Sequence, residues 1–161
     1  MSRTGILFAA CAMAIGLPSA AAGPPSIEAG GFGRYVDTFN SADMSFVDYY
    51  TPDVVFDKGD DGKLVGRDAI ASWYANFWQD FDETLTPLAV AIDRGGEVMM
   101  VELRTELVAK RDGFRWRGRT YAKGDRLIVD GTIVYGLRNG LISSIRGGAE
   151  GRQIIAATQV Q

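Results

Sequence analysis

Apolar residues in the first half of the chain recur at the spacing of a helix face. The first such stripe predicts a helix over residues 27–40 and consists of Phe32, Tyr35, Val36 and Phe39. A short second helix carrying Phe46 is predicted to begin after the capping side chains of residues 40–43 and to end at Pro52. The clearest stripe predicts a third, aromatic-rich helix and consists of Ile70, Trp73, Tyr74, Phe77, Trp78 and Phe81.

A short strand is predicted at residues 54–56. In the second half of the chain, apolar and polar residues then alternate with a period of two, which is typical of strands. Further strands are predicted at residues 88–93, 98–110, 114–123, 126–137 and 141–145. Glycine-containing turns of hairpin type separate three neighbouring pairs of them. Helices followed by antiparallel strands are typical of an α+β domain whose helices pack on one face of a curved sheet. Residues 148–161 have weak periodicity and are expected to form a loose tail.

The N-terminus has the pattern of a secretory signal at residues 1–22. Arg3 provides a positive start, residues 6–17 are apolar, and small residues follow at 18–22. The apolar run is too short to span a bilayer, and a buried N-terminal helix is the alternative. We therefore expect a periplasmic or secreted protein without membrane contact after cleavage, with one domain at residues 23–147.

Composition narrows the possible chemistry. The 161 residues include no histidine and one cysteine, Cys11, which lies in the predicted signal. Catalytic triads with histidine, imidazole metal ligands and imidazole proton shuttles are therefore excluded. The net charge of −3 comes with no basic stripe, so nucleic acid is not an expected partner. Residues 57–62 lack the ligand order of a calcium loop, and no phosphate or dinucleotide motif is present, so we predict no metal and no cofactor.

Several short motifs occur in the same order as in a known family. Arg34-Tyr35-Val36 precedes Asn40 and Asp43, and Asp57 precedes Gly66, Ala69-Ile70 and Tyr74-Ala75-Asn76. This arrangement resembles the SnoaL-like, nuclear-transport-factor-2-like superfamily, and its spacing is most similar to the ketosteroid isomerase branch. The resemblance implies a cone-shaped curved antiparallel sheet with three N-terminal helices packed on its concave face, a pocket between them, and a homodimer.

The resemblance also implies catalytic residues. It places a general base on Asp57 and an oxyanion-binding tyrosine on Tyr35. Apolar neighbours such as Phe56 are expected to raise the pKa of the Asp57 carboxyl. The second oxyanion donor of the isomerases does not carry over, because Ile133 occupies its place and Asp130 is predicted on the other face of the strand. Alternatively, Asp57 caps a turn and Tyr35 belongs to the core.

We therefore expect a cofactor-independent isomerase or lyase for a small hydrophobic, ring-containing substrate rather than a steroid isomerase. Residues expected to contact the substrate are Phe39, Phe56, Trp73, Tyr74, Phe77 and Tyr135. One alternative is a non-catalytic module that binds a hydrophobic ligand. Another is hydration of an epoxide by Arg104 with Glu102 and Glu106, which alternate along one strand face. The opposite face of that strand is apolar, so a solvent or dimer face is the simpler interpretation. The arginines at 115, 117 and 119 are likewise interpreted as a solvated strand face.

Overall fold

The computed structural model describes residues 25–27 and 30–157, so the predicted signal at 1–22 lies outside the described residues. The helices are α1 (Gly31–Asn40), the 3-10 helices η2 (Met44–Tyr49) and η3 (Gly59–Asp61), and α2 (Arg67–Asp80). The strands are β1 (Tyr50–Asp57), β2 (Lys63–Val65), β3 (Phe81–Ile92), β4 (Val98–Ala109), β5 (Phe114–Trp116), β6 (Arg119–Tyr121), β7 (Arg126–Arg138) and β8 (Leu141–Ile155). The order of these elements confirms the predicted α+β class.

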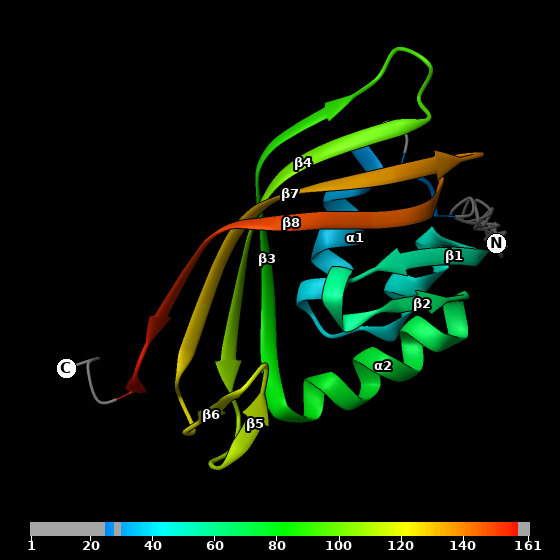
Figure 1. Ribbon diagram of the computed structural model, residues 1–161. Coiled ribbons are helices and arrows are strands. Elements are labelled where there is room, and N and C mark those ends of the chain that lie inside the picture. Colours follow the sequence, from blue (N-terminus) through cyan, green and yellow to red (C-terminus); the bar gives the residue numbers. More distant parts are fainter. Residues whose placement is uncertain (1–24, 28–29, 158–161) are drawn as a thin grey trace, which may run out of the picture.

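Six strands form one curved sheet in the order β2-β1-β8-β7-β4-β3. Strands β4, β7 and β8 bend together over α1, and both α1 and α2 lie on the concave side (Figure 1). We call the side that faces the helices the inner face and the opposite side the outer face. The sheet is mixed rather than fully antiparallel, because β1 runs parallel to β8 while the remaining pairs are antiparallel. The cone-shaped architecture is confirmed with this one change of strand direction.

The helices follow the predicted stripes, with shifted ends. Helix α1 buries the four predicted apolar residues and begins at Gly31, after Gly30 in a left-handed conformation. Helix α2 ends at Asp80, so Phe81 is the first residue of β3 and not the last of the helix. Pro52 lies inside β1 instead of ending the second helix, because a β-region φ suits proline where no ladder hydrogen bond is needed.

The sheet extends further than the alternation predicts. Strand β3 begins at Phe81 rather than at Leu88, and the region 114–123 forms a separate small hairpin, β5–β6. Strand β8 continues to Ile155, so the expectation of a loose tail is wrong for residues 148–155. Glycines weaken the periodicity there, but pairing with β7, such as Leu127 opposite Ile154, supplies the backbone hydrogen bonds.

A dense aromatic core joins the helices to the inner face of the sheet. Phe39, Phe46 and Tyr74 contact one another edge to face, with ring centroids 5.1–5.2 Å apart. A smaller cluster around Phe81 packs the β5–β6 hairpin onto the start of β3. Among the described residues, no helix has the length and apolar character needed to cross a membrane.

Candidate active site

A cavity of about 790 Å³ lies between α2 and the inner face of the sheet. Four residues predicted to contact the substrate line it, namely Phe56, Trp73, Tyr74 and Phe77. The other two are packed into the core: Phe39 is 1% exposed and Tyr135 is 2% exposed. One part of the wall is therefore aromatic, which suits a hydrophobic ligand, and charged side chains line the rest together with aliphatic ones.

Glu83 is an acidic residue in the wall of this cavity, and its side chain is partly buried. It lies on β3 between the buried residues Phe81 and Leu85, which point to the same face of the strand. The indole N–H of Trp78 donates a hydrogen bond to the carboxylate. One carboxylate oxygen, Oε2, is buried and has no hydrogen-bond partner among the described residues. Glu83 thus presents an unpaired oxygen in an apolar environment.

Burial changes the acidity of Glu83. Desolvation of the charged form raises the pKa of Glu83 to about 7, and the hydrogen bond from Trp78 opposes the rise. At neutral pH the carboxyl group is therefore divided between its protonated and ionised forms. A group in this state can accept or donate a proton efficiently at physiological pH.

Tyr74 supplies a hydroxyl to the same cavity. Burial raises its pKa well above the usual value, and the nearby charge of Glu83 raises it further, so the phenol stays protonated. Because Tyr74 lines the cavity, its protonated hydroxyl can donate a hydrogen bond to an oxygen atom of a ligand bound there. Glu83 and Tyr74 therefore form a base and a hydrogen-bond donor on neighbouring walls.

Tyr35, the tyrosine expected to bind the oxyanion, occupies a different environment. Its hydroxyl lies 2.8 Å from the hydroxyl of Tyr50, and both residues are buried. Tyr35 does not line the 790 Å³ cavity. Its hydrogen-bonding capacity is at least partly used inside the core.

Asp57 lies on the other face of β1 from Phe56, as strand alternation requires. It lines a separate hollow of about 560 Å³ with Thr132, Val134 and Arg146, and not the cavity that contains Glu83. Lys63 Nζ lies 2.9 Å from its Oδ2, and the backbone N–H of Gly59 donates to Oδ1 at 3.0 Å. The hydrogen bond from Lys63 and that from Gly59 lower the pKa of Asp57. The expected rise of this pKa is therefore wrong, because the carboxylate has a cation and an N–H donor instead of apolar neighbours.

The carboxylate–arginine group of β4 lies on the outer face. Arg104 and Glu102 are exposed, and Arg104 Nε donates to Asp130 Oδ1 at 2.8 Å. Arg126 Nε donates to Glu106 Oε1 at 2.7 Å. Because the cavity-lining residue Leu107 points to the inner face, this group faces away from the cavity. The structure therefore does not place the Arg104 group of the epoxide-hydrolase alternative in this cavity, and Asp130 is on the outer face as predicted.

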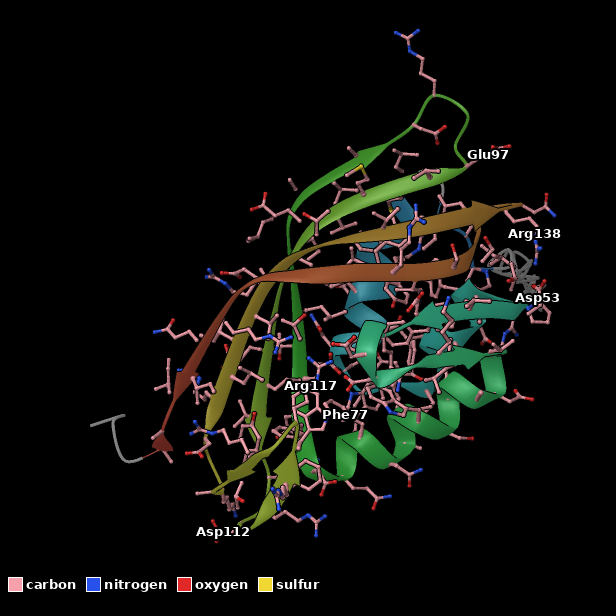
Figure 2. The ribbon with its side chains drawn as sticks, in the orientation of Figure 1. Asp53, Phe77, Glu97, Asp112, Arg117 and Arg138 are labelled. Atoms are coloured by element: carbon pink, nitrogen blue, oxygen red, sulfur yellow. The ribbon has the colours of Figure 1, made fainter. Side chains whose placement is uncertain are left out.

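The arginines of the β5–β6 hairpin are not all solvated, which corrects their interpretation. Arg117 and Arg119 line the cavity and Arg115 does not. Arg119 is partly buried, whereas Arg115 and Arg117 are exposed. Arg117 and Gly118 both have positive φ and form the turn, a geometry that suits a two-residue hairpin. Arg117 pairs with Asp61, and Figure 2 shows Arg117 next to Phe77 below the curved sheet.

Glu83 was not predicted from the sequence, because residues 81–87 were not expected to form a strand. Once β3 begins at Phe81, the alternation Phe81, Glu83, Leu85 places one carboxylate among inward-facing apolar residues. That pattern is the available signal, and it depends on the strand boundary. The described residues contain no group of three or more acidic, cysteine or histidine side chains arranged to hold a metal ion.

Comparison with known proteins now identifies the family. A profile of the SnoaL-like domain matches residues 32–145. The chain belongs to the SnoaL-like domain family. This matched region contains α1 to the middle of β8, including Glu83 and Tyr74. A search of curated protein sequences found no match.

Solved structures share the fold of this SnoaL-like protein at low sequence identity. A candidate polyketide cyclase from Xanthomonas campestris pv. campestris is 21% identical with a TM-score of 0.64, over 72% of this chain and 84% of that one. The Δ5-3-ketosteroid isomerase from Mycobacterium sp. is 16% identical with a TM-score of 0.61, over 77% and 95%. A computationally designed 17-OHP binder is 15% identical with a TM-score of 0.60, over 76% and 92%. At these identities the comparison shows a common fold.

Proposed function

We propose that this SnoaL-like protein is a cofactor-independent acid–base enzyme of the isomerase or lyase type. Its substrate is a small hydrophobic, ring-containing compound that binds in the aromatic cavity. The observation that carries the proposal is the Glu83 carboxyl group, which is buried in the cavity wall with one oxygen unpaired. An isomerase and a candidate cyclase among the structural relatives support a reaction of this class.

In the proposed mechanism, Glu83 removes a proton from a carbon atom next to a carbonyl group of the substrate. The carbonyl oxygen gains negative charge, and the Tyr74 hydroxyl donates a hydrogen bond to it. The protonated Glu83 then returns the proton to another carbon atom or to a leaving group. Return of the proton to another carbon atom completes an isomerisation, and its transfer to a leaving group completes an elimination. The buried position of Glu83 supports the proposal, because its pKa near 7 matches the proton-transfer role.

A non-catalytic binding protein is the second candidate function. The aromatic walls Trp73 and Phe77 are suited to any flat apolar ligand, and a designed binder has the same fold. This alternative does not need an ionisable group in the wall. It predicts saturable ligand binding without proton transfer, so one experiment separates the two functions.

Proton transfer can be measured before the natural substrate is known. The protein is incubated in D₂O with a set of cyclic ketones and aromatic β-ketoesters, and ¹H NMR follows the exchange of the protons next to the carbonyl group. We expect catalysed exchange for at least one compound, and Glu83→Gln should reduce its rate at least ~100-fold, the typical contribution of a general base. Tyr74→Phe should reduce it by a smaller factor.

Asp57→Asn and Arg104→Ala are the matched controls, because both change a charged residue outside the cavity. Each should leave the exchange rate within about threefold of the natural chain. If Asp57→Asn abolishes exchange and Glu83→Gln does not, Asp57 is the base, as the resemblance to the ketosteroid isomerases implied. Binding of these compounds without exchange by the natural chain would support the binding-protein alternative.

A further inference from the structure

Basic side chains gather at one end of the cavity. Arg117, Arg119 and Arg152 line it together with the buried Tyr121. Burial raises the pKa of Tyr121, and the charges of Arg119, Arg117 and Arg152 each oppose the rise. Three guanidinium groups therefore lie close enough to the phenol of Tyr121 to lower its pKa. Lys58 lies over the ring of Trp73 at 4.8 Å and adds a fourth positive charge to the lining.

The nearby carboxylates do not neutralise all of this positive charge. Asp61 pairs with Arg117, and Asp60 is exposed at the rim. The Asp125 carboxylate accepts hydrogen bonds from the backbone N–H groups of Ala157 and Ala122, at 2.9 and 3.0 Å. Its closest approach to Arg119 is 3.9 Å, which is too long for a hydrogen bond.

Arg119 thus keeps an unused donor, and no described carboxylate side chain pairs with Arg152. The Nε atom of Arg119 is buried and has no hydrogen-bond partner among the described residues. Arg152 is exposed in the cavity lining, so its guanidinium is open to a ligand. Buried polar groups normally have a partner, so a donor without one in a cavity wall indicates a missing acceptor. In a chain of net charge −3, this local positive excess favours an anion.

Arg152 lies on β8 and Glu83 on β3, with β7 and β4 between these two strands, so the basic end at Arg152 and Glu83 are separate parts of the cavity. Burial raises the pKa of Glu83 and the hydrogen bond from Trp78 opposes the rise, and no arginine is among the causes of the shift. The aromatic side chains of Trp73, Phe77 and Trp116 line the same cavity, and Phe77 contacts Trp116 at 5.6 Å. A ligand can therefore have an anionic group at one end and a reacting ring at the other.

We propose that the cavity selects a hydrophobic ring compound that carries an anionic group, such as a carboxylate, and that Arg119 and Arg152 bind this group. The ring then lies against Trp73 and Phe77, and the reacting atoms lie at Glu83. The position of the reaction rests on the proposed function, whereas the recognition of the anion does not. Arginine suits this role because its guanidinium can donate two parallel hydrogen bonds to a carboxylate.

Two fluorescent probes test this inference. 1-Anilinonaphthalene-8-sulfonate carries an anionic group, and N-phenyl-1-naphthylamine has the same rings without it. Fluorescence titration of the folded protein should give tighter binding of the anionic probe. Arg119→Gln should weaken that binding at least ~10-fold, and Arg152→Gln should weaken it about threefold or more, as expected for lost charge-assisted hydrogen bonds. Neither change should alter the affinity for the neutral probe by more than about twofold.

Arg115→Gln is the matched control, because it removes the same charge from the same hairpin at an exposed position outside the cavity. It should leave both affinities unchanged. Arg119→Lys keeps the charge and should bind the anionic probe better than Arg119→Gln, which separates a charge effect from loss of folding. Circular dichroism confirms that each variant is folded.

Three results would overturn the inference. They are no binding of the anionic probe, equal effects of Arg119→Gln on both probes, and equal effects of Arg115→Gln and Arg119→Gln. The proposed function fails by a different result, since Glu83→Gln leaves the basic end intact. If this variant binds the anionic probe normally and also retains proton exchange, anion recognition stands and the role of Glu83 does not.

Discussion

The side chain of Asn40 binds both backbone polar groups of Leu85. Its Nδ2 donates to the Leu85 carbonyl oxygen at 2.9 Å, and its Oδ1 accepts from the Leu85 N–H at 2.8 Å. Strand β3 is at the edge of the sheet, so these backbone groups have no neighbouring strand on that side. The last residue of α1 thus takes the place of a strand, and it fixes β3 two residues away from Glu83.

Replacing Asn40 by alanine should therefore destabilise the protein. Leu85 loses both partners in a partly buried position, and we expect the free energy of unfolding to fall by about 1–3 kcal/mol. Chemical denaturation monitored by tryptophan fluorescence measures the change. The control is Asn76→Ala on α2, because its side chain only bonds the Ser72 carbonyl within an exposed helix face. Equal stability of the two variants would contradict a structural role for Asn40.

The raised pKa of Glu83 predicts a pH-dependent stability. Between about pH 4.5 and 7 the carboxyl is ionised in the unfolded chain but protonated in the folded one. The unfolded state then binds fewer protons, so the free energy of unfolding falls as the pH rises through this window. The shift corresponds to a loss of about 3 kcal/mol above pH 7.

Glu83→Gln removes this ionisation and keeps an acceptor for Trp78. The difference in unfolding free energy between Glu83→Gln and the natural chain should grow in favour of the variant from pH 4.5 to pH 7 and then stay constant. Urea titrations at closely spaced pH values measure it. A constant difference over the whole range would show that Glu83 titrates normally in the folded protein.

The hydrogen bond between Tyr35 and Tyr50 predicts a non-additive pair of substitutions. Tyr35→Phe leaves a buried Tyr50 hydroxyl without this partner and should cost about 1–2 kcal/mol of stability. The double variant with Tyr50→Phe should cost less than the sum of the single changes, because no orphaned hydroxyl remains. A thermodynamic cycle from denaturation curves tests this.

Activity provides the second measurement for Tyr35. Proton exchange per folded molecule should stay within about fivefold in Tyr35→Phe, since Tyr35 does not line the cavity. A loss of exchange comparable to that of Glu83→Gln would instead support the oxyanion-binding role that the family resemblance implied.

Gly147 allows β8 to pass closely over β7. A Cβ atom at this position would lie 2.3 Å from Ile133 Cδ1 and 2.9 Å from the Thr132 carbonyl oxygen. We expect Gly147→Ala to destabilise the protein by about 1–3 kcal/mol, as overpacking does in other cores. Gly148→Ala is the matched control, because no atom lies within 4 Å of its added Cβ. Thermal unfolding of the two variants tests the difference, and equal melting temperatures would show that β8 shifts easily.

The signal at residues 1–22, the periplasmic or secreted location and the homodimer remain predictions from sequence. Export would be tested by expressing the full chain in a Gram-negative bacterium and measuring the mass of the periplasmic product, which should lack the N-terminal segment. The oligomeric state would be measured by analytical ultracentrifugation of that product.

The sequence by itself determined the elements whose signals are local. The stripe from Ile70 to Trp78 produces α2 because its period matches one helix face, and the alternation along β4 correctly placed Arg104 on the solvent side. The motif spacing also indicated the family. These features could be predicted because they depend on neighbouring residues and on the contrast between apolar and polar positions.

Only the tertiary structure decided which polar residues face the cavity. Phe56 and Asp57 are adjacent, so strand alternation puts them on opposite faces, and the packing of β1 against α2 determines that Phe56 points inward. Glu83 acquires its chemistry from burial by Trp78 and the opposite walls, which the sequence around it does not encode. The absence of histidine, together with a single cysteine that lies in the predicted signal, limited the expected chemistry to carboxylates, phenols and basic groups. Among the carboxylates, the fold distinguishes Glu83 by raising its pKa. The reason is that desolvation depends on the assembled cavity and not on the residue alone.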